Sequence, residues 1–410
     1  MNWGTRLVRI RAWNDIYKGI MKRWAIAIRV LAATLMCTAV ARAHAMDVFY
    51  GGVAFLGDYS KIAESYPFSA ALSQASNGAP SELDVAALEK LKSVSNASFD
   101  IVFDRLGELG PKSTSAIALA LTIDRESVSV ENIAGLNKLV IQISAQALFF
   151  DFKEKSVVAS YPFTVQYVDV KNHLPTQPEI GSLVRSLYLG ELGVNVLDEF
   201  KKTLNRATLN VNVSRRVQVK DVNVAEAALA LLPQSKRDAI ADFKSELAQD
   251  FSKFLSSNQQ IPVLPYTSGY AIGNRMAARF ANGTVFELKI PEADYVISID
   301  LNNLKRIEGV KSGAGMSIIY GAFLGVRLFE PLSNKTYFDA IIKNGATKLV
   351  PAGQETIDDW PAFEDSMIAL MSKFTSAISD APADYVGSAV SNKSVQPDFE
   401  KLKKVLQSCK

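Results

Sequence analysis

The chain is poor in the residues that most often build metal sites and active sites. Its 410 residues include two cysteines, two histidines and four tryptophans. Only one residue of each type follows residue 45, namely His173, Cys409 and Trp360. A disulfide within residues 46–410 and a zinc site built from Cys and His ligands are therefore excluded. A Cys–His pair or a Ser-His-Asp triad would depend on His173, whose polar surroundings are typical of an exposed loop.

An excess of basic charge is also missing once the first 45 residues are set aside. The formal net charge of +3 comes from 45 basic and 42 acidic residues. Residues 1–45 hold eight of these basic residues and one of the acids, which leaves 37 and 41 in residues 46–410, a net charge of −4. An acidic remainder argues against a nucleic-acid partner. The glycine-rich segment 309–317 lacks the lysine of a phosphate loop, so we expect no cofactor.

Residues 21–45 have the three parts of a secretory signal peptide. A basic start precedes an apolar run of twelve residues, 30–41, which is short for a membrane span. Ala43 and Ala45 then place small residues at positions −3 and −1 of a cleavage site before Met46. We expect a cleaved leader within residues 1–45, with Met21 as its natural start, and a periplasmic mature chain. An uncleaved anchor helix and a lipid anchor at Cys37 are the less favoured alternatives.

Patterns of apolar residues predict an α+β protein with two similar mixed domains. Each domain is expected to hold a small sheet, with a long antiparallel hairpin, packed by helices. The first domain is placed at residues 46–206, with its hairpin over 139–168 and a helical stretch over 179–206. The second is placed at 261–380, with an opening strand at 261–266, a helix at 272–280, a hairpin over 317–342 and a closing helix at 360–378.

Two further segments complete the expected organisation. Residues 207–260 are assigned to a connection that contains a strand, an amphipathic helix over 235–255 and a polar linker at 256–260. Residues 381–410 are assigned to a tail with a short C-terminal helix. A displacement of 176 residues aligns Thr122-Ile123-Asp124 with Ser298-Ile299-Asp300. Identity along this alignment is near chance, so the suggestion of a tandem duplication depends on the repeated order of elements.

Four residues are candidates for ligand binding. Asp124 and Asp300 each follow the alternating part of a predicted strand, where a carboxylate is suited to a cation or a polar ligand. A hydrogen-bonded residue at a strand end or bulge is the alternative. Arg105 is suited to an anionic ligand, with a solvated strand edge as its alternative. Trp360 is suited to a sugar ring, beside the carboxylates of Asp358, Asp359 and Glu364.

Clusters of carboxylates are the one catalytic resource left, and most have a simpler interpretation. Asp358, Asp359 and Glu364 suit the positive N-terminal turn of the predicted helix over 360–378. Asp238, Asp242, Glu246 and Asp250 recur every four residues opposite an apolar face, a pattern typical of a solvated helix surface.

The C-terminal segment offers two possible modes of association. Phe399, Leu402, Val405 and Leu406 share one helix face that is bordered by lysines, so peripheral contact with an anionic membrane is one interpretation. Docking of that face on its own domain is the other. Cys409 has no partner in residues 46–410, which permits a disulfide-linked homodimer.

Segments of both halves resemble a known module of the bacterial envelope. The segment Phe99-Asp100-Ile101-Val102-Phe103-Asp104-Arg105 is similar to the first central strand of this module, and residues 148–160 are similar to its hairpin. In this respect the chain resembles the periplasmic domain of the curli-secretion channel family and the N-terminal domain of the Tol-system propeller protein. The resemblance implies a binding and assembly module without catalytic residues, and partners among envelope proteins, including those associated with the outer membrane.

The function we expect from the sequence is that of a non-enzymatic periplasmic protein that binds or assembles other components of the cell envelope. An exported hydrolase that acts on glycans through two carboxylates is the main alternative. A secreted structural or self-assembling protein is the other.

Overall fold

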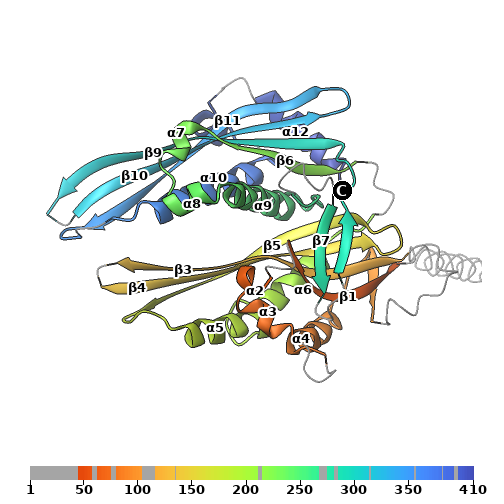
Figure 1. The fold of residues 1–410 in the computed structure, drawn as a ribbon. Helices are drawn as coiled ribbons and strands as arrows, with labels where there is room; N and C mark the ends of the chain where they lie inside the picture. The colour runs from red at the N-terminus through yellow and green to blue at the C-terminus, as the bar shows by residue number, and fades with distance from the viewer. Residues whose placement is uncertain are drawn as a thin grey trace, which may run out of the picture. The chain divides into compact units, whose positions relative to one another are not determined.

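Two mixed β-sheets, with helices packed against both, build the described part of the chain (Figure 1). The computed structural model describes residues 45–410 except for 58–61, 75–79, 104–115, 134, 211–214, 267–274, 281–284, 314, 355–356, 381 and 392–395. The α+β class predicted from the sequence is confirmed. The signal-peptide segment with Ala43, and the candidate Arg105, lie outside the described residues.

The first sheet has seven strands in the order β2-β1-β3-β4-β5-β8-β7. Its strands are β1 (Met46–Leu56), β2 (Phe99–Val102), β3 (Ile117–Ile133), β4 (Leu136–Asp151), β5 (Ser156–Lys171), β7 (Arg275–Phe280) and β8 (Val285–Lys289). Strand β1 runs parallel to β3, whereas β3, β4 and β5 follow one another as an antiparallel meander. Strand β7 also pairs with β1, and β8 meets β5 at a single position, Ser156 opposite Lys289.

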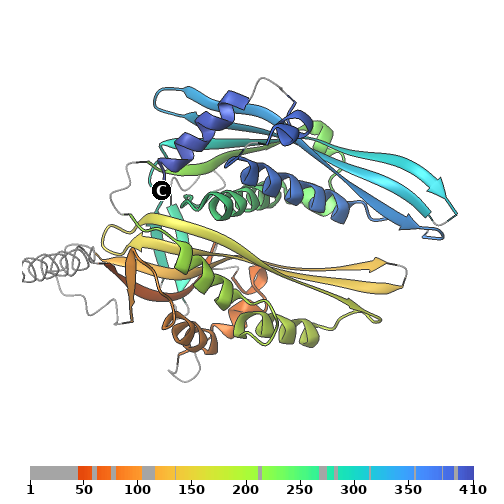
Figure 2. The same cartoon turned by 180° about the vertical axis from the view of Figure 1, so that it is seen from behind.

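The second sheet has four strands in the order β11-β10-β9-β6. They are β6 (Val217–Val224), β9 (Tyr295–Ser312), β10 (Gly315–Glu330) and β11 (Lys335–Pro351). Strand β6 runs parallel to β9, and β9, β10 and β11 form an antiparallel meander. Strands β6, β9, β10 and β11 therefore repeat the order and directions of β1, β3, β4 and β5, and Figure 2 shows the two meanders from behind.

Three β-bulges occur at matching places in the two sheets. The ladder between β1 and β3 skips Gly51, and the ladder between β6 and β9 skips Lys220. Asp124 is the extra residue of β3 against β4, and Asn302 is the extra residue of β9 against β10. The third pair is Val158 in β5 and Tyr337 in β11. Because each bulge fixes the register of its ladder, the two halves share their register as well as their strand order.

These bulges correct the displacement of 176 residues that was chosen from the sequence. Asp124 corresponds to Asn302, 178 positions later, and Asp300 corresponds to Thr122. The turns of the two hairpins also differ from a displacement of 176, since Lys155 and Asn334, 179 positions apart, both have a left-handed backbone conformation there, with φ of 48° and 53°. The pairing of Asp124 with Asp300 was therefore wrong by two residues.

The helices of the first half pack on the β3-β4-β5 meander and against each other. They are α2 (Ile62–Ser65), α3 (Ser69–Leu72), α4 (Glu82–Leu91), α5 (Gln177–Leu189) and α6 (Val196–Arg206). Ser81 caps α4 by accepting a hydrogen bond from the Asp84 amide, and Thr176 and Glu179 form a capping box on α5. The φ of 86° at Gly190 ends α5, because the left-handed conformation favours glycine. Helix α6 contacts β4 and β5.

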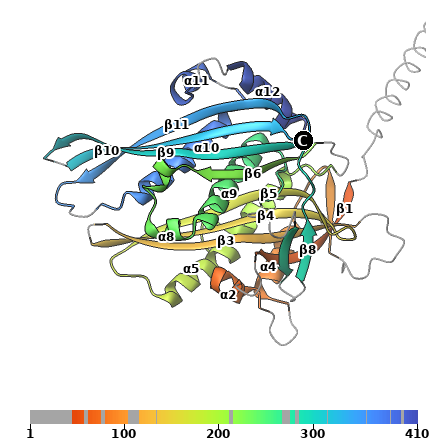
Figure 3. The ribbon, with the colours of Figure 1, turned by 45° about the horizontal axis from the view of Figure 1, so that its top comes forward.

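The segment expected to connect the two domains belongs instead to the second sheet and its core. Strand β6 lies beside β9, while α7 (Glu226–Leu229), α8 (Gln234–Asp238) and α9 (Ile240–Gln259) follow it. Helix α9 contacts β6, α10 (Trp360–Ala377) and β5. Figure 3 shows these elements in a tilted view. The second half therefore begins at β6, near residue 217. Residues 261–266 form only one bridge, Gln218 with Leu264, and are not its opening strand.

The expected polar linker at 256–260 is instead the C-terminal end of α9, where Ser256 and Gln259 are buried. Ser256 donates a hydrogen bond from Oγ to the carbonyl oxygen of Ile261, and Gln259 donates one from Nε2 to the carbonyl oxygen of Thr375. These bonds satisfy polar groups that would be costly to bury alone. The segment is therefore part of the second half and not a linker between two domains.

One predicted helix is a strand in the structure. Residues 275–280 form β7, which pairs with β8 and with β1. The sequence Arg-Met-Ala-Ala-Arg-Phe favours a helix by local propensity. Pairing with two neighbouring strands overrides that propensity, because local preference is worth only a few tenths of a kcal/mol per residue.

The C-terminal helix docks on the second half of its own chain. In α12 (Gln396–Gln407), Phe399, Leu402 and Leu406 are no more than 2% exposed. Cys409 is buried too, and burial raises the pKa of its thiol to about 12. The expected membrane contact through this helix and the expected disulfide dimer would both require the helix to detach. Among the described residues no helix combines the length and hydropathy needed to cross a membrane.

Helix α9 allows a direct test of the core. Phe251 is 1% exposed and lies 6.1 Å from Phe374, measured between ring centroids. We expect Phe251→Ala to lower the free energy of unfolding by about 3–5 kcal/mol, because it removes buried surface and leaves a cavity. Leu332→Ala, at a position 99% exposed, should change it by less than about 0.5 kcal/mol. Urea denaturation followed by circular dichroism measures both, and equal effects would contradict the placement of α9.

Candidate functional site

The candidate Asp124 lies at the bulge of β3 inside a polar network. Its carboxylate Oδ1 accepts a hydrogen bond of 2.8 Å from Nε2 of Gln146 on β4, and the Gln146 side chain accepts one from Ser160 on β5. The Tyr66 hydroxyl lies 2.8 Å from the backbone carbonyl oxygens of Asp124 and Leu56. Burial raises the pKa of Asp124 to about 7, against an opposing effect of the Gln146 hydrogen bond. The alternative interpretation of Asp124, a hydrogen-bonded residue at a bulge, is confirmed.

The second half does not repeat this network. Asn302 occupies the bulge of β9, and Gly325 takes the place of Gln146 on the neighbouring strand. A Cβ atom at Gly325 would lie 3.0 Å from Nδ2 of Asn302 and 3.3 Å from Cβ of Asp300, so a side chain would crowd both. Asp300 itself is half-buried and accepts a hydrogen bond of 2.9 Å from Nδ2 of Asn223. Asp124 and Asp300 therefore do not occupy equivalent sites.

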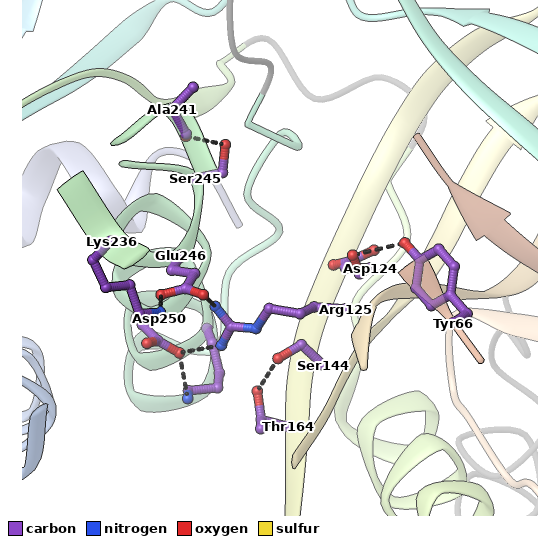
Figure 4. Close-up of polar contacts among 11 residues, drawn as sticks. Tyr66, Asp124, Arg125, Ser144, Thr164, Lys236, Ala241, Ser245, Glu246 and Asp250 are labelled. Carbon is purple, nitrogen blue, oxygen red and sulfur yellow. Dashed lines mark hydrogen bonds and ion pairs between the residues drawn. The ribbon is translucent and has the colours of Figure 1, made fainter. Parts of the chain in front are cut away.

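Next to Asp124, the Arg125 side chain extends from β3 to helix α9 (Figure 4). Its guanidinium lies 3.5 Å from Oε1 of Glu246 and 4.0 Å from Oδ1 of Asp250. Lys236 lies 2.6 Å from the other Glu246 oxygen, and Lys253 lies 3.0 Å from Asp250. We call these five side chains, Arg125, Lys236, Glu246, Asp250 and Lys253, the α9 charge cluster.

Within the acidic stripe, Asp238 and Asp242 are exposed as expected, whereas the α9 charge cluster corrects the interpretation of Glu246 and Asp250 as a solvated surface. The side chains of Glu246 and Asp250 are 23% and 13% exposed, and that of Arg125 is 18% exposed. At Glu246 and Asp250 the polar face of α9 is covered by the first sheet, and its apolar face is covered by the core. The helix is therefore amphipathic, but it has no solvated face at these two residues. The cluster has three cations and two carboxylates. Glu364 on α10 is close enough to interact with Lys236 and Glu246, and burial raises the pKa of its carboxyl.

A cavity of about 350 Å³ adjoins the cluster and wraps around the edge of β5. Tyr161 and Phe163 line it from the β5 face that α6 covers, since the Phe163 ring stacks on Phe200 of α6. Thr164 and Gln166 line it from the opposite face, as side chains alternate along a strand. Helix α9 and Ile368 of α10 complete the wall.

The wall of this β5-edge cavity combines apolar surface with cations. Phe163 and Tyr161 are 6% and 5% exposed, and the ring of Phe254 lies 4.3 Å from Nζ of Lys253. Lys202 and Arg206 lie one turn apart on α6, and the wall contains one carboxylate, that of Glu199, 3.0 Å from Lys202. Arg206 has no ion-pair partner among the described residues. The arrangement is suited to binding a small molecule.

Trp360 is a structural residue and lies outside this cavity. It begins α10, and its ring packs edge to face on Phe243 with a centroid distance of 5.7 Å. Asp358 accepts a hydrogen bond from the Trp360 amide. Asp359 instead accepts from the Tyr320 hydroxyl and lies 3.1 Å from Nε of Arg306. The Trp360 side chain is thus partly buried against the core, where its packing on Phe243 gives it a structural role.

His173 lies on the surface, as its sequence context indicated. Its side chain is 53% exposed, with Nε2 2.9 Å from Oε1 of Glu179 in the capping box of α5. Hydrogen bonds from Thr176, together with that from His173, lower the pKa of Glu179 to about 2. The His173 imidazole thus contributes to the capping box at the N-terminus of α5. Among the described residues no group of three or more His, Cys, Asp or Glu side chains is arranged to hold a metal ion.

Sequence reasoning missed the β5-edge cavity and the α9 charge cluster. The residues involved come from β3, β5, α6, α9 and α10, which are far apart along the chain. A signal was present in the acidic stripe of α9, but its partner Arg125 lies more than a hundred residues earlier. Only the packing of α9 against β5 brings the two together.

No protein-family model matches the chain, and no curated protein matches it. Three solved structures are similar to parts of the chain at low TM-scores. A Helicobacter pylori homolog of the neuraminyllactose-binding hemagglutinin is 14% identical with a TM-score of 0.26, over 46% of this chain and 92% of that one. A hypothetical protein of Chlamydia trachomatis is 14% identical with a TM-score of 0.24, over 41% and 100%. A minor lipoprotein of Acinetobacter baumannii is 6% identical with a TM-score of 0.19, over 40% and 89%.

TM-scores at this level do not establish a shared fold for the whole chain, and they transfer no ligand or activity to it. The function is therefore argued below from the chain's own residues.

The raised pKa of Asp124 predicts a pH-dependent stability. Between about pH 4 and pH 7 the folded chain retains a proton on Asp124 that the unfolded chain releases, so the stability that this carboxyl group contributes is complete below pH 4 and is lost as the pH rises to 7. We expect Asp124→Asn to remove this dependence. Between pH 4 and pH 8, the free energy of unfolding of the variant should therefore rise relative to that of the wild type by on the order of 2 kcal/mol. Urea denaturation at both pH values measures the gain, and parallel pH profiles would contradict it.

Asp358 and Asp359 provide a matched pair of substitutions. Asp358 is exposed, whereas Asp359 is half-buried against Arg306 and Tyr320. We expect Asp359→Asn to lower the free energy of unfolding by about 1–2 kcal/mol and Asp358→Asn by less than about 0.5 kcal/mol. Thermal unfolding monitored by circular dichroism compares them. Equal losses would restore helix-end electrostatics as the main role of both residues.

Proposed function

We propose that the chain is a non-enzymatic binding protein of the bacterial cell envelope and that the β5-edge cavity is its binding site. The cavity supports this proposal by itself. Its volume lies at the lower end of the range for small-molecule sites, and its wall is aromatic and cationic. The predicted signal peptide supports an envelope location, and the module resemblance supports a binding role.

The composition of the cavity wall favours binding over glycan hydrolysis. A glycosidase needs two carboxyl groups roughly 5–10 Å apart in one cleft. The wall contains only Glu199, which is paired with Lys202. The carboxylates of Glu246 and Asp250 lie in the neighbouring cluster, where each contacts two cations. No pair of carboxyl groups therefore faces the space that a substrate would occupy.

Filling the cavity tests the proposal. Thr203 lines it from α6, and Lys201 lies on the same helix outside the wall. We expect the wild-type chain and Lys201→Trp to retain a small molecule from envelope extract that Thr203→Trp does not, because the added indole occupies the space. Native mass spectrometry of the recovered chains measures the bound mass. His173→Ala should retain the molecule as the wild type does.

Circular dichroism checks that Thr203→Trp is folded, since overpacking costs about 1–3 kcal/mol. Equal retention by the folded Thr203→Trp variant would show that binding occurs elsewhere. Retention by none of the variants or the wild type would refute the binding role of the cavity.

A further inference from the structure

The β5-edge cavity has an unequal distribution of charge. Three cations, Lys202, Arg206 and Lys253, face it, against the single carboxylate of Glu199. Lys202 is paired with Glu199, so the charge is balanced there. Arg206, by contrast, is exposed and has no ion-pair partner in the described part of the chain. The wall therefore carries a net positive charge.

The α9 charge cluster lies at the inner side of the cavity and shares Lys253 with its wall. Lys253 belongs to both, with its side chain 16% exposed, 3.0 Å from Asp250 and over the ring of Phe254. Asp250 also lies 4.0 Å from Arg125, so its negative charge is shared between two cations. Arg125 has in addition a buried Nε without a hydrogen-bond partner. Because the cluster and Glu364 place as many carboxyl groups as cations there, the positive excess lies in the cavity wall itself, at Arg206, and in a partly desolvated region it favours an anion.

The rest of the cavity wall is apolar and is suited to an apolar part of a ligand. Tyr161, Phe163, Phe254 and Ile368 supply aromatic and aliphatic surface, and the two aromatic rings on β5 are held in place by packing against α6 and β4. Burial of apolar ligand surface against such side chains is favourable, whereas a small hydrophilic anion would leave them without a contact. The cavity is thus suited to a molecule that has both an anionic group and an apolar part.

We propose that the β5-edge cavity binds a small amphiphile with a single anionic head group, placed near Arg206 and Lys253, and an apolar chain against Phe163 and Phe254. This inference rests on the proposed binding function and specifies the ligand class. A carboxylate and a phosphate head group share the required chemistry. The test below therefore contains both.

Isothermal titration calorimetry with defined probes tests the ligand class on the purified chain. Dodecanoate and dodecyl phosphate supply the two anionic head groups below their micelle concentrations. Dodecyl maltoside and dodecyltrimethylammonium supply a neutral and a cationic head on the same chain, and acetate supplies an anion without the chain. We expect at least one anionic amphiphile to bind about tenfold or more tightly than either the neutral or the cationic one, and acetate not to bind measurably.

Charge reversal at Arg206 tests the position of the head group without disturbing the core. Arg206→Glu changes an exposed side chain, and Lys201→Glu makes the same change on α6 outside the cavity wall. We expect Arg206→Glu to weaken binding of the anionic amphiphile by about tenfold, and to narrow or reverse its advantage over dodecyltrimethylammonium. Lys201→Glu should leave both affinities within about twofold of the wild type, because its charge is more screened at the cavity.

The outcomes separate this inference from the proposed function. If anionic and neutral amphiphiles bind with equal affinity, and Thr203→Trp abolishes both, the inference of an anionic head group is wrong. The proposed binding function would remain. Equal effects of Arg206→Glu and Lys201→Glu would overturn the placement of the head group. If no amphiphile binds, the inference fails, and the retention experiment with Thr203→Trp decides separately whether the cavity binds another class of molecule.

Discussion

Helix α9 is buried on two opposite sides, and much of the structure depends on this constraint. Phe243, Leu247, Phe251 and Leu255 pack into the core of the second half. On the other side, Glu246 and Asp250 meet Arg125 of the first sheet, with Lys236 and Lys253 beside them. A buried ion cluster adds little net stability over an apolar contact, but the loss of one partner is costly. The cluster therefore specifies where α9 lies against β3 and β5 more than it stabilises the fold.

The position of α9 also explains why a cavity forms at the edge of β5. Strand β5 pairs with β4 along its length, whereas on its other side the described residues provide only the pairing of Ser156 with Lys289 and a hydrogen bond from the Val263 amide to the Ser160 carbonyl oxygen. An open strand edge invites association with other chains, and proteins commonly cover or charge it. Here α6 and α9 approach the edge from the two faces of the sheet, and Lys202, Arg206 and Lys253 surround it. The space that the two helices leave between them is the β5-edge cavity.

The two halves show how one scaffold supports different interiors. Matching bulges preserve the strand register, but Asp124 and Gln146 in the first half are replaced by Asn302 and Gly325 in the second. The first half thus keeps a carboxyl group with a raised pKa inside a hydrogen-bonded network. In the second half, the missing side chain at Gly325 leaves room for Asn302 and Asp300. A shared topology therefore does not imply a shared site.

The sequence by itself determined the α+β class, the β4-β5 and β10-β11 hairpins and the long amphipathic helices, because alternation and helical periodicity are local patterns. It also indicated that His173 is an exposed loop residue and that Asp124 is a hydrogen-bonded bulge residue. Only the tertiary structure decided that β6 and α9 belong to the second half, that residues 275–280 form a strand and that the α12 face is covered, since each outcome depends on a distant partner. The β5-edge cavity and the α9 charge cluster belong to the same group. Their residues are brought together by packing between elements, which no local pattern encodes.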